Sequence, residues 1–363
     1  MKPASFDLYR YRLPLTASLR LKGATLHYRE GFLLRLAGDD GCEGWGETAP
    51  LPGFSSEGMG EAATALRGLA GFIVGREVTD NWLDWEGDLA SESDQLDAAP
   101  SVRFGFELAL WNLYAASTGT TLAELITPRP RATVPVNGLL SGSPDEILGE
   151  ARRMRDAGYG TVKLKVGGRS VEKDVGLVRA LGGLLGDGVS LRLDANRAWE
   201  LEEAAEFARG VAGVRFEYVE EPLADPARLP ELVREFGVPV ALDESLVGMA
   251  PEALDEHRYV RAVVLKPTLL GGISRSLRFA ERALRLGMTP VVSSAYESGV
   301  GTAALVALAA GIGDRSVPVG LDTYRRLAMD VLVSPLDLSA PSVRVREANE
   351  ASHRVDVLRL EAP

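Results

Sequence analysis

The segment TVKLKVGGRSVEKDVGLVRALGGLLGDGVSLRLDAN (161–196) is typical of a strand, a helix and a second strand. Two β-branched apolar runs, 161–166 and 190–196, flank a stretch with helical periodicity. The same alternation continues from about residue 130, with predicted strands at 132–138, 161–166, 190–196, 216–222, 239–245, 262–268, 289–295 and 317–322. Eight such units in series favour a closed parallel (β/α) barrel. An open doubly wound sheet is the alternative, but no GxGxxG motif follows a strand in the early units.

The rest of the chain has a different pattern. Residues 1–125 begin with segments typical of antiparallel strands and continue with helical stretches at 56–75 and 101–118. The C-terminal stretch 342–361 again resembles strands. We therefore expect an α/β protein, a modified TIM-type barrel with an α+β N-terminal capping domain that the C-terminal segment completes. The predicted boundaries are 1–125 for the cap, 126–325 for the barrel and 326–363 for the return to the cap. Ser143 and Glu146 form a capping box that predicts a helix start.

Composition excludes several classes of function. The formal net charge of −11 disfavours nucleic acid as a partner. The N-terminal residues 1–15 lack the apolar run of a signal peptide, and the longest apolar run, 303–313, is too short to span a bilayer. We expect a cytoplasmic protein without a membrane partner, and the sequence leaves open a homo-oligomer. The single cysteine, Cys42, excludes a disulfide within the chain. A histidine-based triad or zinc site is disfavoured because the three histidines are widely separated: His27, His257 and His353.

Lysines are rare and unevenly placed. Only six of the 40 basic residues are lysines, and three of these, Lys163, Lys165 and Lys266, lie on predicted barrel strands. Arginine is not deprotonated in proteins, whereas lysine can give and take protons. Residues i and i+2 of a strand share a face, so Lys163 and Lys165 are expected to face the barrel interior and Leu164 the helices. The pattern indicates an enzyme, although a barrel lysine can also serve as an ion-pair partner.

Three acidic residues, Asp194, Glu220 and Asp243, end three consecutive predicted strands. Three oxygen ligands without histidine or cysteine are typical of a hard-cation site, most simply Mg²⁺, with Mn²⁺ as a substitute. The alternative is that each acid caps the following helix. A metal-bound carboxylate substrate would have an acidified α-proton, because the metal stabilises the enediolate. Positive neighbours favour a neutral amine at Lys165, and Lys266 would approach the opposite face of the substrate.

Five short motifs carry a resemblance to a known family: KLK (163–165), DAN (194–196), EEP (220–222), DES (243–245) and KPT (266–268). Over nearly its whole length the chain resembles the muconate-lactonizing subgroup of the enolase superfamily. The resemblance implies that Asp194, Glu220 and Asp243 are metal ligands. It implies that Lys165 and Lys266 form an acid/base pair, with Lys163 as a further catalytic residue. Glu221 and Glu244 would then support or cap these groups.

Within the subgroup, five stretches are similar to the o-succinylbenzoate synthase family of menaquinone biosynthesis: 44–57, 100–111, 191–199, 293–301 and 320–327. The resemblance implies a carbon–oxygen lyase, specifically a hydro-lyase. Its reaction would be the syn dehydration of 2-succinyl-6-hydroxy-2,4-cyclohexadiene-1-carboxylate. In this reaction Lys165 removes the α-proton and returns it to the departing hydroxyl group. Lys266 stabilises the intermediate as an ammonium group, electrostatically or across the ring face.

Other activities remain open or disfavoured. An N-succinylamino acid racemase would use Lys165 and Lys266 as alternating bases, and a dual-function enzyme would do both reactions. A noncatalytic barrel that binds a metal or metabolite is the more distant alternative. Dipeptide epimerases carry Asp-x-Asp at the eighth strand, where this chain has only Asp322. Sugar-acid dehydratases use a barrel histidine, and no predicted strand of this chain ends in one.

Two cap loops, 16–28 and 50–57, are expected to close over the site. Phe54 would cover the substrate ring, or alternatively pack at the domain interface. The N–H groups of the turn 298–301 would hold a carboxylate at a helix N-terminus. The predicted substrate contacts are Phe54, Asn196, Ser293, Ser294, Glu297, Ser298, Gly299 and Leu321.

Overall fold

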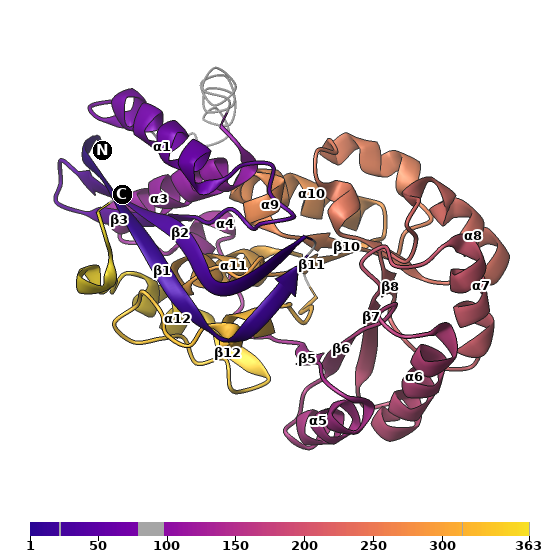
Figure 1. The fold of residues 1–363 in the computed structure, drawn as a ribbon. Helices are drawn as coiled ribbons and strands as arrows, with labels where there is room; N and C mark the ends of the chain where they lie inside the picture. Colours follow the sequence, from indigo (N-terminus) through magenta and orange to yellow (C-terminus); the bar gives the residue numbers. More distant parts are fainter. Residues whose placement is uncertain (22, 79–97, 314, 363) are drawn as a thin grey trace.

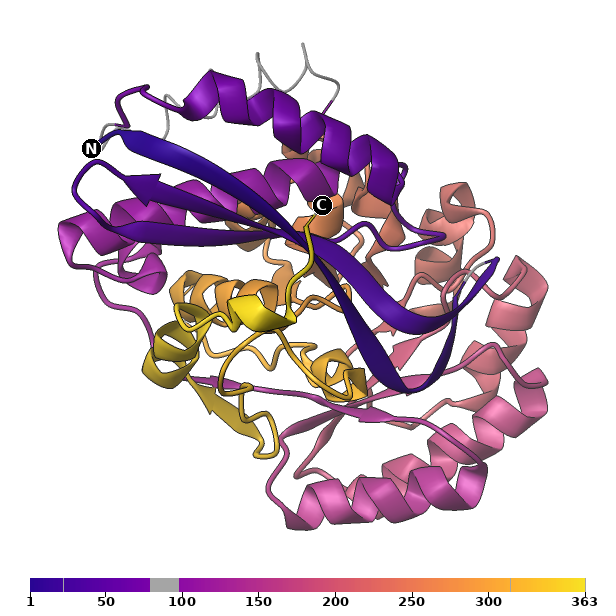
Figure 2. The same cartoon turned by 60° about the vertical axis from the view of Figure 1, so that its left-hand side comes forward.

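The computed structural model describes residues 1–21, 23–78, 98–313 and 315–362 (Figure 1). Its N-terminal part is an antiparallel sheet in the order β1-β2-β3, built from β1 (Pro3–Leu21), β2 (Ala24–Gly38) and β3 (Glu43–Thr48). Two helices, α1 (Met59–Ile73) and α3 (Pro100–Thr118), pack against this sheet, and the β1–β2 hairpin extends beyond them toward the second body of the protein (Figure 2). This cap reaches the mouth of the barrel described below.

Glycines allow α3 to lie directly on β3. A Cβ atom at Gly46 would be 1.9 Å from the carbonyl oxygen of Gly105, and one at Gly44 would be 2.2 Å from that of Ala109. Only residues without a side chain allow the helix and strand backbones to approach so closely. The close contact fixes the position of β3, whose last residues lead into the loop above the barrel.

The second body is a parallel barrel. Seven strands run in the order β11-β10-β9-β8-β7-β6-β5. Their bounds are β5 (Gly138–Leu140), β6 (Thr161–Lys165), β7 (Ser190–Asp194), β8 (Val219–Glu220), β9 (Val240–Leu242), β10 (Ala262–Leu265) and β11 (Thr289–Val292). Single bridges from Val319 to Val136 and from Gly320 to Ser293 take the eighth place and close the ring. The predicted barrel is confirmed, with a very short eighth strand.

The prediction of a first barrel strand at 132–138 was wrong in extent. Residues Thr133–Pro135 form β4, which pairs antiparallel with β12 (Ser342–Arg344) outside the barrel. At Val136 the chain changes partner: the Asn137 N–H donates to the carbonyl of Val319, and β5 begins at Gly138. Sequence periodicity does not reveal such a change of partner, because both parts are extended.

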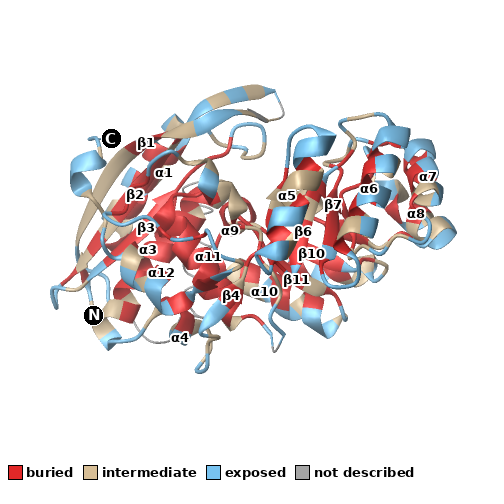
Figure 3. Cartoon of the chain, turned by 90° about the horizontal axis from the view of Figure 1, so that it is seen from below, coloured by how far each residue is buried: buried red, intermediate tan, exposed pale blue. Residues whose placement is uncertain are grey.

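Helices cover the outside of the barrel. They are α5 (Pro144–Asp156), α6 (Val171–Leu185), α7 (Leu201–Gly210), α8 (Leu229–Phe236), α10 (Ile273–Arg285) and α11 (Gly299–Gly311), with α4 (Leu122–Ile126) leading in from the cap. The short α9 (Pro267–Leu270) follows β10 and packs against α3 of the cap. Short 3₁₀ segments follow β8, β9 and the eighth place: η1 (Pro226–Arg228), η2 (Glu244–Leu246), η3 (Pro251–His257) and η4 (Asp322–Arg326). Ser143 caps α5 as its capping box predicts. Buried residues concentrate in the barrel wall and under the cap sheet, and exposed ones on the outer helix faces (Figure 3).

The C-terminal segment differs from its predicted strands. Only β12 is extended, and the chain continues as α12 (Val345–Ser352) against α11, followed by η5 (Val357–Arg359). The buried residues of α12, Val345, Ala348 and Ser352, recur with helical spacing, so the prediction of strands here was wrong. The end of the chain then joins the cap sheet, because Arg10 and Glu361 exchange two backbone hydrogen bonds of 2.8 Å. The predicted boundaries near 125 and 325 fall in α4 and η4 and stay predictions.

None of the helices in the described ranges combines the length and the apolar character that a bilayer span requires.

Candidate active site

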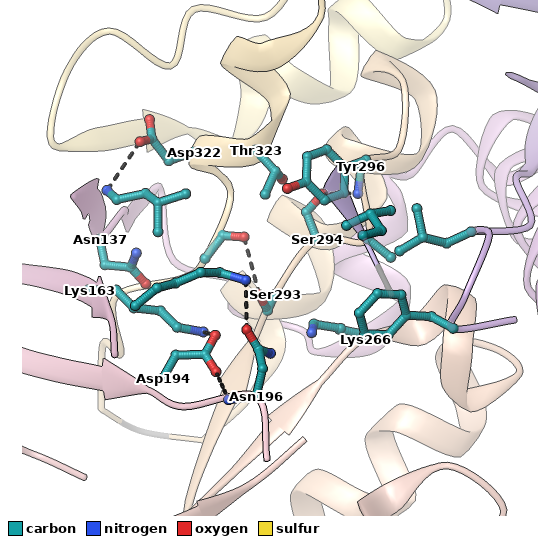
Figure 4. A pocket seen from close by; sticks show the side chains of 17 residues that line it. Asn137, Lys163, Asp194, Asn196, Lys266, Ser293, Ser294, Tyr296, Asp322 and Thr323 are labelled. Atoms are coloured by element: carbon teal, nitrogen blue, oxygen red, sulfur yellow. Dashed lines mark hydrogen bonds and ion pairs between the residues drawn. The ribbon is translucent and has the colours of Figure 1, made fainter. Parts of the chain in front are cut away.

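The polar residues at the strand ends form one continuous row. In the parallel ladders Lys165 pairs with Asp194, Asp194 with Glu220, and Glu220 with Ala241. Asp243 directly follows β9, two residues beyond Ala241, and its carboxylate pairs with Lys266, which directly follows β10. The register alone brings these side chains from separate β/α units to one mouth of the barrel. Figure 4 shows Lys163, Asp194 and Lys266 around the resulting pocket.

Two lysines neutralise the three acids. The Lys163 Nζ lies 2.9 Å from Asp194 Oδ2 and 2.7 Å from Glu220 Oε2, and Lys266 forms an ion pair with Asp243. With the three acids paired to lysines in this way, no three acidic, histidine or cysteine side chains of the described residues lie grouped closely enough to hold a metal ion. One oxygen, Oε1 of Glu220, is buried and has no hydrogen-bond partner in the described part of the chain. A set of three carboxylates with an unpartnered buried oxygen fits a hard divalent cation such as Mg²⁺.

The buried charges shift one another. Burial, and next the charge of Asp194, raise the pKa of Glu220 to about 8. Burial alone would raise the pKa of Asp194, but Lys163 and Lys165 outweigh it and lower that pKa. Burial likewise favours a neutral Lys163, yet Asp194 and Glu220 hold its pKa well above the usual value. Burial also raises the pKa of Asp243, so positive charge does not fully compensate the burial of Glu220 and Asp243.

Lys165 has a different partner. Its Nζ donates to Oδ1 of Asn196 at 2.7 Å, and no carboxylate within the described ranges pairs with it. Asn196 is itself fixed, because its Nδ2 donates to Glu244 Oε1 at 3.2 Å and its backbone N–H to Asp194 Oδ1 at 3.1 Å. The Lys165 amine therefore lies at the pocket beside a neutral, oriented amide, whereas Lys163 and Lys266 are held by acids.

The loops around the pocket contain strained backbone. The non-glycine residues with positive φ in the described chain are Asn196 (44°), Arg197 (61°), Glu221 (40°) and Tyr296 (65°). All follow barrel strands at the mouth of the pocket, and such strain persists only where surrounding contacts fix it. Glu221 supplies such contacts, since its carboxylate accepts from the N–H groups of Asp243 at 2.9 Å and Ser245 at 2.8 Å. The supporting role expected of Glu221 has this geometric basis.

The pocket has a charged floor and an apolar roof. The cap contributes Leu21, Leu51 and Phe54, and the barrel contributes Asn137, Leu139, Lys163, Lys165, Asp194, Asn196, Lys266, Ser293, Ser294, Ala295, Tyr296, Gly320, Asp322 and Thr323. Leu51, Ala295 and Leu269 form a buried cluster that Leu21, Phe54 and Tyr296 extend. Phe54 thus lines the pocket and also packs at the interface between cap and barrel, and its contact with a substrate ring stays a prediction. Residue 22 of the loop 16–28 lies outside the described residues.

The predicted substrate contacts divide into two groups. Phe54, Asn196, Ser293 and Ser294 line the pocket, whereas Glu297, Ser298, Gly299 and Leu321 are not among the lining residues. Glu297 is fully buried and accepts from the Ser294 hydroxyl at 2.6 Å and the Ala295 N–H at 2.7 Å, so it fixes the loop. Several lining residues were not predicted individually, among them Leu51, Asn137, Leu139 and Tyr296. Leu51 lies within the predicted loop 50–57, and Tyr296 directly precedes the predicted Glu297, so their positions in the sequence were the available signal.

The start of α11 needs a correction. We expected the N–H groups of 298–301 to hold a ligand carboxylate, but they already have acceptors within the protein. Glu47 accepts from the N–H groups of Ser298 at 2.7 Å and Gly301 at 2.8 Å. The Gly299 N–H donates to Asp330 at 2.9 Å and the Val300 N–H to the Ser298 hydroxyl at 3.3 Å. We therefore do not retain this turn as a carboxylate site. It is instead a joint between cap and barrel.

This joint gives a stability prediction. Glu47 is fully buried, and its carboxylate also accepts from Tyr11 Oη at 2.5 Å. Glu47→Ala removes a charged acceptor from several buried donors, so we expect the free energy of unfolding to fall by about 3 kcal/mol. Denaturant unfolding measures this loss. The control is Glu61→Ala, which removes the exposed acceptor of the Gly58 N–H at α1 and should cost only about 0.5 to 1 kcal/mol. Equal losses in the two variants would contradict a special role for Glu47.

Comparison with known proteins agrees with the barrel and the cap. Residues 146–349 match the family model described as "Enolase C-terminal domain-like", and residues 3–113 match "MenC, N-terminal domain". The chain belongs to the enolase superfamily.

Its similarity to individual proteins is more specific. It is 34% identical to an o-succinylbenzoate synthase of Pectobacterium atrosepticum, over 92% of this chain and 94% of that protein. It is 32% identical to an o-succinylbenzoate synthase of Yersinia pseudotuberculosis, over 96% of this chain and 98% of that protein. The resemblance read from the motifs is confirmed at this level.

Solved structures show the same fold. A muconate lactonizing enzyme from Pseudomonas fluorescens, complexed with muconolactone, has a TM-score of 0.84 at 25% identity and covers 99% of this chain and 98% of its own. The L-Ala-D/L-Glu epimerase of Bacillus subtilis has a TM-score of 0.83 at 25% identity, with 95% and 96% covered. A dipeptide epimerase of Enterococcus faecalis, complexed with Mg and L-Leu-L-Tyr, has a TM-score of 0.84 at 21% identity, with 95% and 97% covered. Proteins of this fold thus include a magnesium complex.

Proposed function

We propose that the protein is a hydro-lyase that dehydrates 2-succinyl-6-hydroxy-2,4-cyclohexadiene-1-carboxylate to o-succinylbenzoate, a step of menaquinone biosynthesis. The observation that carries the proposal is the placement of Lys165 and Lys266 in one pocket, on strands four places apart around the ring. They can reach a bound ring from different sides. The curated relatives named o-succinylbenzoate synthase, similar over nearly the whole chain, support this particular reaction.

The three carboxylates would hold the metal. Asp194, Glu220 and Asp243 supply oxygen ligands from neighbouring positions of the wall, and Glu220 Oε1 is the oxygen without a partner in the described residues. When bound, Mg²⁺ supplies the positive charge that stabilises negative charge developing on the substrate carboxylate.

Lys165 is the proposed base. Its amine, oriented by Asn196, takes the proton from the ring carbon that bears the carboxylate. The resulting ammonium then gives this proton to the hydroxyl group that leaves from the same face of the ring. One C–H and one C–O bond break, water departs, and the electrons of the C–H bond complete the aromatic ring. A single residue therefore suffices for a syn elimination.

Lys266 is the proposed electrostatic partner. Burial favours its neutral form, but the charge of Asp243, followed by that of Glu220, raises the pKa of Lys266 above its usual value. It therefore remains an ammonium group and can stabilise negative charge in the transition state. A racemase would instead need Lys266 to act as a base in one direction of the reaction.

The eighth strand end supports a substrate without an ammonium group. Asp322 accepts a hydrogen bond from the Leu139 N–H at 3.1 Å and one from Arg325 at 3.4 Å. With both carboxylate oxygens engaged by the protein, Asp322 is poorly suited to hold a substrate ammonium. The apolar roof of Leu21, Leu51 and Phe54 suits a carbocyclic ring instead.

A paired assay of the purified protein tests the proposal. With Mg²⁺ we expect rapid loss of the cyclohexadiene absorbance, removal of this activity by a chelator, and its return when Mg²⁺ is restored. The second arm follows α-deuterium exchange of N-succinyl amino acids, which should be much slower. Fast exchange with little dehydration would identify an N-succinylamino acid racemase, and comparable rates a dual-function enzyme. The absence of both activities would favour a noncatalytic barrel.

Lys266→Arg extends this assay, because arginine keeps the charge but cannot act as a base. Dehydration should persist in part, whereas any exchange that needs two bases should be lost.

A further inference from the structure

Arg29 of β2 is a buried cation that connects the cap to the barrel. Its side chain is only 2% exposed. Its Nε donates to the carbonyl oxygen of Tyr296, in the loop after β11, at 2.9 Å. Its two other nitrogens donate to the carbonyl oxygens of Pro50 at 2.6 Å, Glu30 at 3.0 Å and Ala49. One guanidinium group thus binds backbone from β2, from the loop after β3 and from the barrel.

These bonds use the side chain in an unusual way. No carboxylate in the described ranges lies within ion-pair distance of Arg29, although burying an unpaired charge is costly. Its acceptors are all backbone carbonyls, and those of Ala49, Pro50 and Tyr296 lie in loops, which have no regular secondary structure to satisfy them. The geometry therefore suits a residue that fixes backbone positions rather than one that balances a charge.

The backbone that Arg29 fixes carries the roof of the pocket. Ala49 and Pro50 directly precede Leu51, and Leu51 and Phe54 line the pocket from above. On the barrel side Arg29 binds Tyr296, which lines the same pocket and has a strained φ of 65°. Leu51, Phe54 and Tyr296 share one apolar cluster. Arg29 therefore fixes both sides of the roof through a single group, without lining the pocket itself.

We propose that Arg29 is a positioning residue for substrate binding: it sets the distance between the cap loop 49–54 and the barrel loop 295–296. This inference rests on the proposed function for the identity of the substrate. The structural part of the proposal, that Arg29 holds the two loops in place, does not depend on the identity of the substrate. Lysine cannot replace arginine here. The planar guanidinium group donates to carbonyls on three segments at once, whereas lysine has a single ammonium group that cannot reach all of them.

The test compares Arg29→Met and Arg29→Lys with Arg131→Met. Arg131 also donates to backbone carbonyls, those of Gly313 at 2.7 Å, Ala309 at 2.5 Å and Ile312 at 2.5 Å, but at the far end of α11 from the pocket. In dehydration assays with Mg²⁺ we expect kcat/KM of Arg29→Met to fall by about 100-fold, mostly through KM. The roof contacts the substrate away from the reacting carbon, which is why KM should change most. Arg29→Lys should recover little, and Arg131→Met should keep both constants.

The kinetic pattern distinguishes positioning from stability. A variant that is only less folded has a lower apparent kcat and an unchanged KM. That result for Arg29→Met, or an equal change in Arg131→Met, would overturn the proposal. If Arg29→Met does not fold, Arg29→Lys, which keeps the charge, allows the same comparison.

Hydrogen exchange tests the inference independently of the reaction. The amides of Phe54 and Ser55 donate to Leu51 O at 3.0 and 2.8 Å, and that of Tyr296 to Ser294 Oγ at 3.0 Å. These amides should exchange faster in both Arg29 variants than in wild type and in Arg131→Met. Unchanged exchange would overturn the proposal. A wild-type protein inactive toward the cyclohexadiene substrate would instead refute the proposed function and leave this exchange comparison valid.

Discussion

Lys165→Ala should lower the rate of dehydration by at least about 1,000-fold, because it removes the base that takes the α-proton and the acid that releases the hydroxyl group. Its effect on stability should be small. Lys165 is exposed, and its Nζ donates to Asn196 at 2.7 Å without a carboxylate partner in the described residues. The buried Asp194 keeps its ion pair with Lys163 when Lys165 is lost. Steady-state kinetics and thermal unfolding of the same preparation measure the two effects separately.

Lys173→Ala is the matched control for this variant. Lys173 is an exposed lysine of α6, one element further along the chain, and its replacement should change neither rate nor stability. Dehydration by Lys165→Ala at a rate near that of wild type would remove Lys165 from the role of base. An equal loss of dehydration activity in both lysine variants would indicate a general effect of the protein's charge.

Lys163→Met should produce the largest change in stability. In metal-free protein Lys163 lies between Asp194 and Glu220, which have little exposed surface of their own. Removing the cation that contacts both carboxylates should lower the free energy of unfolding by about 3 to 5 kcal/mol. Denaturant unfolding without Mg²⁺ measures this loss. Added Mg²⁺ should restore part of it, because bound metal stabilises the folded state.

A double variant gives the control. In Lys163→Met/Glu220→Gln one negative charge is removed together with the lysine, so most of the stability should return while the response to Mg²⁺ weakens. If Mg²⁺ stabilises Lys163→Met no more than this double variant, the assignment of Glu220 as a metal ligand is contradicted.

Much of the barrel could be predicted because it depends on local patterns. Alternating apolar runs, the capping box at Ser143 and the i, i+2 spacing of Lys163 and Lys165 need only neighbouring residues for their interpretation. The row formed by Lys165, Asp194 and Glu220 follows once the strands are parallel and in register. The alternation of strand and helix repeats in each β/α unit, so an error in the bounds of one strand does not change the predicted barrel.

Contacts between distant segments could not be predicted in the same way. Lys163 and Lys165 share a strand face, yet one binds two acids and the other an amide. The motif containing Glu47 suggested a family, but nothing in it indicates that this carboxylate occupies the start of α11, 251 residues away in sequence. The helix α12 was missed because a short segment with mixed polarity fits a strand nearly as well.

The contact between Glu47 and the start of α11 limits how the cap and the barrel can evolve separately. Glu47 lies in the cap, whereas the N–H groups that it accepts from, those of Ser298 and Gly301, lie in the barrel. Recombination that exchanged the cap alone between diverged relatives would place a foreign side chain at a buried helix terminus. The stretches 44–57 and 293–301 should therefore evolve as a pair, although most of the chain separates them.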